Sequence, residues 1–183
     1  MKLAPIVEGH GEVEALPTLI RGLFPSLQVL RPLRVQRNRF LNNSEERMRF
    51  LTLAQNNLGQ QGAILVLLDA DEDCPAELAP RLMSQLGLVT RLNCHLVLAK
   101  CEFETWFLAG ADALRLGQVP KDVEAIQGAK EEIRRRMGGY YSQTVDQPKL
   151  AARMAAECDP HLLRERSPSF DKLWRELEKI ANA

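Results

Sequence analysis

The sequence has few features of membrane, zinc-binding or disulfide-stabilised proteins. No stretch approaches the roughly 18 uninterrupted apolar residues of a membrane span, and the residues before Glu8 are too few for a signal-peptide core. The four cysteines form no C-x-x-C pair, and with only three histidines they do not complete a zinc ligand set. We therefore expect a soluble, cytoplasmic protein with free thiols and no membrane association.

The chain also has no net charge. Lys plus Arg and Asp plus Glu each total 24, which argues against a nucleic-acid binder that relies on overall positive charge. Hydrophobic residues make up 45% of the sequence, so the chain can bury a sizeable core. A length of 183 residues, without an internal repeat or a linker rich in Pro, Gly or Ser, predicts one domain.

Apolar runs alternate with amphipathic segments over the first hundred residues. Strands are predicted over 2–7, 27–35, 63–68 and 92–99, and helices over 12–24, 44–58 and 75–86. This alternation predicts an α/β fold, a mostly parallel sheet of about four strands with helices on both faces. Further helices are predicted over 103–116, 121–137, 147–157 and 169–181. The domain, residues 1–183, would then have a sheet core (1–110) and a helical C-terminal part (111–183).

Carboxylates follow three of the four predicted strands. Because ligands of parallel sheets bind beyond the carboxyl ends of the strands, these side chains are expected at one edge. Their repulsion would be relieved by a hard divalent cation, and all-oxygen ligands favour Mg²⁺ or Mn²⁺. Alternatively, Asp71 or Asp73 caps the helix that starts at Pro75. The six strand-end carboxylates are Glu8, Glu12, Asp69, Asp71, Glu102 and Glu104.

Arginines supply local positive charge despite the neutral total. Arg34 near the end of the second predicted strand, with Arg37 and Arg39 just after it, forms a candidate phosphate-contact stretch for nucleic acid. A solvated surface is the alternative interpretation of the same stretch. The run Arg134–Arg136 is more typical of a solvated helix face.

Two of the acidic motifs resemble those of a known family. The first predicted strand continues into Val7-Glu8-Gly9-x-x-Glu12, and the third ends in Asp69-x-Asp71. In this order they resemble the two signature motifs of Toprim domains, which occur in topoisomerases, bacterial primases and OLD-family nucleases. The chain also resembles a compact, stand-alone bacterial Toprim-like family of unassigned function, in the stretches that begin at Glu102, Tyr141 and Ser167.

The resemblance implies a metal-dependent nuclease that hydrolyses phosphodiester bonds in DNA or RNA. Many members of the compact family are encoded beside an ATPase in defence-type operons, which implies an ATPase partner. This chain has no G-x-x-x-x-G-K-[ST] loop of its own, so any ATP-driven control must come from another chain.

The resemblance also implies roles for single residues. Glu8 would act in catalysis as well as in metal binding, and the other five strand-end carboxylates would bind metal. Within that set, Glu102-x-Glu104 matches the element that supplies a second metal site in OLD nucleases. A downstream lysine assists catalysis in those enzymes; Lys149 is the best match here, followed by Lys100.

Other readings of the sequence stay open. A non-catalytic Toprim-like module could dock on a partner ATPase and bind nucleic acid without cutting it. A phosphatase of the haloacid-dehalogenase type also uses D-x-D at a strand end, but it places its nucleophile on the first strand, where this chain has Glu8. Tyr140 and Tyr141 could be nucleophiles, although paired tyrosines before a turn are more often packing residues. The sequence leaves open whether the protein is a homo-oligomer.

Overall fold

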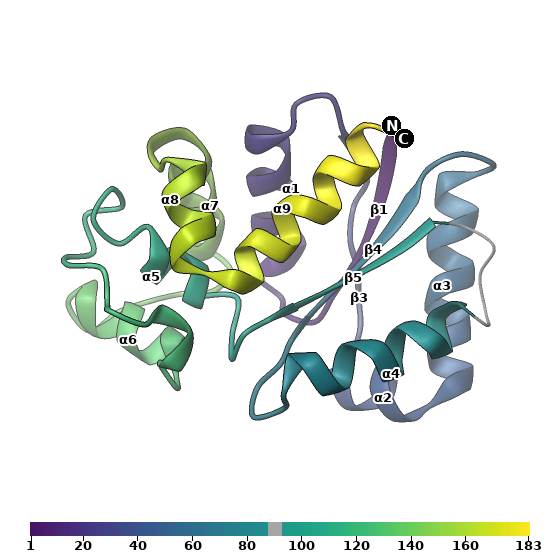
Figure 1. Ribbon diagram of the computed structural model, residues 1–183, viewed down its shortest axis with the longest axis horizontal. Helices are drawn as coiled ribbons and strands as arrows, with labels where there is room; N and C mark the ends of the chain where they lie inside the picture. Colours follow the sequence, from purple (N-terminus) through teal and green to yellow (C-terminus); the bar gives the residue numbers. More distant parts are fainter. Residues whose placement is uncertain (88–92) are drawn as a thin grey trace.

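A parallel five-stranded sheet lies at the centre of the computed structural model, which describes residues 1–87 and 93–183 (Figure 1). The strand order is β2-β1-β4-β5, and β3 also pairs with β1. Every pairing is parallel, which confirms the predicted sheet type. The strands are β1 (Lys2–Val7), β2 (Gln28–Val29), β3 (Leu33–Arg34), β4 (Ala63–Asp69) and β5 (Asn93–Ala99).

The two central strands are buried on both faces, which explains their continuous apolar runs. In β4, Leu65 and Leu67 pack into one hydrophobic core, while Ile64 and Val66 point into the other. Side chains of a strand alternate between faces, so an unbroken apolar sequence fills two cores at once. One core lies under each face of the sheet.

Helices cover both faces of the sheet, as predicted (Figure 1). One face carries α2 (Arg37–Asn42), α3 (Ser44–Leu58) and α4 (Pro75–Gly87). On the other, α9 (Pro168–Ala181) crosses β5, and α7 (Asp146–Glu157) packs along α1 (Glu12–Leu23). Gly22 permits the α1–α7 contact, since a Cβ there would lie 2.5 Å from that of Ala155.

The remainder of the chain forms short helices, shown at the left of Figure 1. They are α5 (Thr105–Ala109), the 3₁₀ helix η1 (Val123–Ala125), α6 (Ala129–Arg136) and α8 (Pro160–Arg166). The five strands all lie before residue 100, and the regular elements after it are helices. The C-terminal part is therefore helical, as predicted. Within the described ranges 1–87 and 93–183, no helix is both long and apolar enough to cross a membrane.

Several predicted boundaries are wrong. The strand over 27–35 is two short strands, β2 and β3, and the chain then enters the unpredicted α2. The helix over 103–116 ends at Ala109, and that over 121–137 is broken before Gly128, whose φ of 69° is left-handed. The helix α8 was not predicted, although Asp159 caps it and Pro160 begins it. Residue 92, the predicted start of the fourth strand, lies outside the described residues.

Candidate metal site at the carboxyl ends of the strands

The six strand-end carboxylates line one cavity of about 540 Å³. The turn after β1 contributes Glu8, and the start of α1 contributes Glu12. The end of β4 contributes Asp69 and Asp71, and the turn after β5 contributes the other two. Parallel strands end at the same edge, so acids separated by more than ninety residues meet there.

The backbone is bent where β4 and β5 end. Asp71 has a φ of 50° and Cys101 a φ of 60°, both left-handed values that are uncommon outside glycine. The Asp71 N–H donates to the Cys101 carbonyl oxygen at 3.0 Å, so the two bends support each other. Backbone conformations of this kind persist only where the surrounding fold holds them in place, and they are concentrated at functional sites.

Backbone N–H groups hold three of the carboxylates. Asp69 accepts from the Phe103 N–H at 2.8 Å, and Glu12 accepts from the Glu8 N–H at 3.2 Å. Glu102 accepts from the Lys130 N–H at 2.8 Å. The bonds of Asp69 and Glu102 each join two different segments of the cavity wall, and that of Glu12 spans the turn between β1 and α1. The backbone therefore fixes the positions of all three carboxylates.

A distant segment of the chain holds Glu104. Its Oε1 accepts from the Tyr141 hydroxyl at 3.0 Å and from the side-chain amides of Gln147 at 3.3 Å and Gln143 at 3.4 Å. Gly11 makes room for this segment, since a Cβ there would lie 2.3 Å from the Gln143 carbonyl oxygen. The segment 141–147 therefore completes the wall of the cavity.

Burial and mutual repulsion perturb the ionisation of these acids. Burial raises the pKa of Asp69 well above its ordinary value, and the charges of Glu12, Glu104 and Glu8 raise it further. Burial likewise raises the pKa of Glu12 to about 7. The pKa values of Glu8 and Glu104 are also raised, chiefly by burial. A group of acids perturbed in this way has a large free energy to gain from a bound cation.

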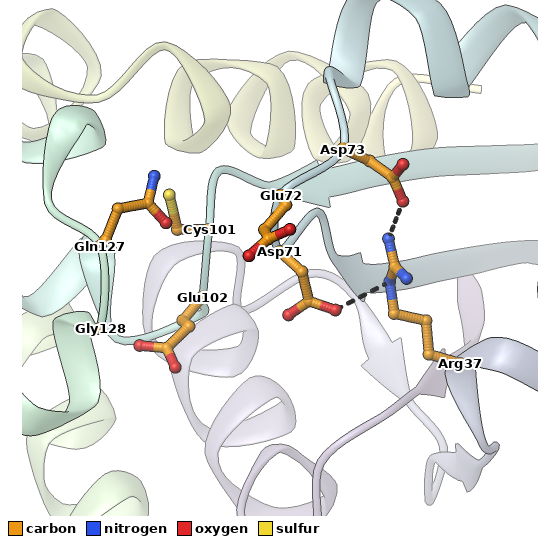
Figure 2. A pocket seen from close by; sticks show the side chains of 8 residues that line it. All are labelled: Arg37, Asp71, Glu72, Asp73, Cys101, Glu102, Gln127 and Gly128. Carbon is orange, nitrogen blue, oxygen red and sulfur yellow. Dashed lines mark hydrogen bonds and ion pairs between the residues drawn. The ribbon is translucent and has the colours of Figure 1, made fainter.

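Arg37 neutralises the outer acids from within the protein. It forms ion pairs with Asp71, at 3.4 Å, and with Asp73 (Figure 2). Its Nε also donates to the Asp69 carbonyl oxygen at 2.8 Å, and its Nη2 to the Ala70 carbonyl oxygen at 3.1 Å. The side chain is only 10% exposed and its Nε and Nη2 bind protein groups, so Arg37 is poorly placed for the predicted phosphate contact.

The other two candidate nucleic-acid contacts differ in position. Arg34 is exposed and lines the cavity with the carboxylates. Arg39 is also exposed, on α2, but it is not among the residues that line this cavity. Arg134 and Arg135 are exposed and pair with Glu131 and Glu132 on their own helix, as expected of a solvated helix face. Arg136 differs, because it is largely buried and also donates to the Leu116 and Gln118 carbonyl oxygens.

The lysine beside the carboxylates is Lys130, not the predicted Lys149. Lys130 lines the cavity, and its Nζ donates to Gln143 Oε1 at 3.1 Å. Lys149 lies on α7 with 69% of its side chain exposed and its Nζ 3.7 Å from Asp146. It does not line this cavity, because α7 turns that face of the helix outward.

Sequence reasoning missed Lys130 and Gln143, which lie far along the chain from the strand-end motifs. No local pattern marks either residue. One usable signal is Gly11, because a glycine can mark the close approach of another segment, here that of Gln143. Tyr141 is also not suited to be a nucleophile, since burial and Glu104 raise its pKa.

The carboxylate oxygens are suitable ligands for a divalent cation, but their side chains do not surround a metal position in this structure. Within the described ranges, no three His, Cys, Asp or Glu side chains are placed so that they could hold one metal ion. Glu8 Oε2, however, is buried and has no hydrogen-bond partner among the described residues. An orphaned carboxylate oxygen is costly to bury, and it faces other oxygen donors in the same cavity. The strand-end carboxylate side chains would therefore have to rotate modestly to bind a divalent cation together.

The family model described as a domain of unknown function (DUF4276) matches residues 7–178. The chain belongs to this family. The matched range covers every strand-end carboxylate and the segment 141–147, so the cavity lies wholly within the family's domain. No curated protein and no solved structure matches the chain.

Proposed function

We propose that this DUF4276 protein is a metal-dependent, Toprim-like nuclease that hydrolyses phosphodiester bonds in DNA or RNA. The observation that carries the proposal is the convergence of six carboxylates from three strand ends on one cavity. The orphaned Glu8 Oε2 and the resemblance to the two Toprim motifs support the same conclusion.

Glu8, Asp69 and Asp71 would hold one Mg²⁺ or Mn²⁺ ion, and Glu12, Glu102 and Glu104 would help to hold a second. When bound, the metal would neutralise charge on the attacked phosphate and make a water molecule more acidic. Asp71 would have to exchange its ion pair with Arg37 for the metal. Arg37 would then remain paired with Asp73 and keep the turn after β4 in place.

Two side chains would handle protons and developing charge. Glu8 would accept a proton from the attacking water. The Lys130 ammonium would leave Gln143 and donate to a phosphate oxygen as negative charge develops there. Tyr141 and the glutamines around Glu104 would hold that carboxylate in position.

Cleavage of a labelled oligonucleotide with Mg²⁺ or Mn²⁺ tests the proposal. We expect Asp69→Asn to abolish metal-dependent cleavage, and Lys130→Met to lower kcat about 10²- to 10³-fold, as removal of one charge-stabilising donor does elsewhere. Lys149→Met is the matched control and should leave the rate unchanged. Full activity of the Asp69→Asn protein contradicts the proposal. If Lys149→Met loses cleavage activity and Lys130→Met does not, Lys149 and not Lys130 is the catalytic lysine.

A non-catalytic module that docks on a partner ATPase is the second candidate function. It is favoured by the ion pairs of Arg37, which satisfy Asp71 and Asp73 without a metal. Calorimetric titration with Mg²⁺ and a plasmid-nicking assay, each with and without a candidate ATPase partner, separate the two. Metal binding without cleavage in either condition favours the module, whereas cleavage that requires the ATPase favours a regulated nuclease. A homo-oligomer and a cytoplasmic location remain part of the proposal.

A further inference from the structure

A second cavity, of about 390 Å³, adjoins the one lined by the carboxylates. His10 and Arg34 line both cavities, so the two are neighbours. The second cavity adds Arg31 from the loop before β3, Glu14 from the first turn of α1, and Thr144 from the segment 141–147. It therefore leads away from the carboxylates between α1 and β3.

The arginines of this second cavity differ from most others in the protein. Arg31 and Arg34 are exposed, and within residues 1–87 and 93–183 neither forms an ion pair. Most of the other described arginines are paired with a carboxylate, including Arg37, Arg136 and Arg166. Two unpaired guanidinium groups against the one carboxylate of Glu14 give this cavity a positive charge.

Another flank of the carboxylate site has the reverse charge. A cavity of about 740 Å³ there is lined by Asp71, Glu72, Asp73 and Glu102 (Figure 2). Among the described residues that line it, the one cation is Arg37, which is already engaged by Asp71 and Asp73. A phosphate chain on this side would meet surplus negative charge, so the two flanks of the site are electrostatically unequal.

We propose that the cavity lined by His10, Arg31, Arg34 and Thr144 binds the phosphates that flank the phosphodiester held at the carboxylates. The polynucleotide chain would then leave the site between α1 and β3 and not over the acids at 71–73. Arg31 and Arg34 would each contact a phosphate, and the Thr144 hydroxyl would donate to a third oxygen. This inference rests on the proposed function, since it names the path of that substrate.

Binding measured without cleavage tests the inference separately from the nuclease proposal. Fluorescence anisotropy with labelled single-stranded DNA and RNA oligonucleotides of one sequence, in EDTA, compares the wild type with the double variant Arg31→Ala/Arg34→Ala. The matched control is Arg81→Ala/Arg115→Ala, which removes two exposed arginines that line neither cavity and changes the net charge equally. Comparison of the affinities for the DNA and RNA oligonucleotides identifies which nucleic acid the protein binds more tightly.

We expect the Arg31/Arg34 double variant to bind about tenfold or more weakly at 0.1 M salt. Two lost phosphate contacts should also reduce the slope of log K against log salt by about 1.4 for a single strand. The control variant should stay within about twofold of the wild type. Equal binding by the two double variants, or no binding by the wild-type protein, would overturn the inference. Cleavage by an Asp69 variant would contradict the nuclease proposal and leave this binding result unaffected.

Discussion

Replacement of Glu12 by glutamine should stabilise the metal-free protein. Glu12 is only 2% exposed, and burial beside other acids raises its pKa from 4.5 to about 7. Below pH 4.5 this carboxyl is neutral in both the folded and unfolded states. Between pH 4.5 and 7 only the unfolded state gives up the proton, so folding stability falls as the pH rises. At about 1.4 kcal/mol for each pH unit of that interval, the loss reaches about 3 kcal/mol above pH 7.

A glutamine side chain keeps the acceptor for the Glu8 N–H and removes the charge. In EDTA at pH 8 we therefore expect Glu12→Gln to raise the free energy of unfolding by about 2–3 kcal/mol, and Tm by about 4–12 °C for a domain of this size. At pH 4.5 the gain should vanish. Urea denaturation at both pH values measures this, with Glu14→Gln, an exposed carboxylate on the same helix, as the control. A Glu12→Gln protein that is no more stable at pH 8 would refute the reasoning.

Two further predictions concern the scaffold of the site. Gly11→Ala should lower the free energy of unfolding by about 1–3 kcal/mol, because its Cβ would clash with the Gln143 carbonyl oxygen. Gly87→Ala is the control and should be neutral, since no atom of the described residues lies within 4 Å of a Cβ there. Equal urea midpoints of the two variants would contradict this. Burial alone would raise the pKa of Glu176, but hydrogen bonds from His95 and two lysines lower it to about 2. The stability of the wild type over Glu176→Gln, at most about 3 kcal/mol after solvent screening, should therefore be present above pH 4.5 and disappear as the pH falls towards 2. A difference that persists unchanged at pH 2 would contradict that assignment.

The sheet and its acidic edge could be predicted from the sequence because both depend on local patterns. A continuous apolar run such as 63–68 is typical of a strand buried on both faces, and β4 occupies that range. Parallel pairing brings the strand ends together without any knowledge of side-chain contacts. The convergence of Glu8, Asp69 and Glu102 follows from that topology.

The rest of the site depends on contacts between distant segments. Lys130 reaches the cavity because α6 begins at Ala129, beside the turn after β5, and Glu104 is held by residues of the segment 141–147. Nothing in the sequence near these residues indicates their partners. The same applies to Arg37, which is drawn into the turn after β4 by two aspartates and is therefore not free for a phosphate.

A crystal structure of the protein grown with Mn²⁺ tests the metal site most directly, since anomalous scattering identifies the ion independently of activity. We predict at least one Mn²⁺ ion bonded to carboxylate oxygens of Glu8 and Asp69, with Asp71 rotated away from Arg37. A second ion would lie towards Glu12 and Glu104. Crystals grown in saturating Mn²⁺ that show no anomalous density among these carboxylates would contradict the claim that they form a metal site.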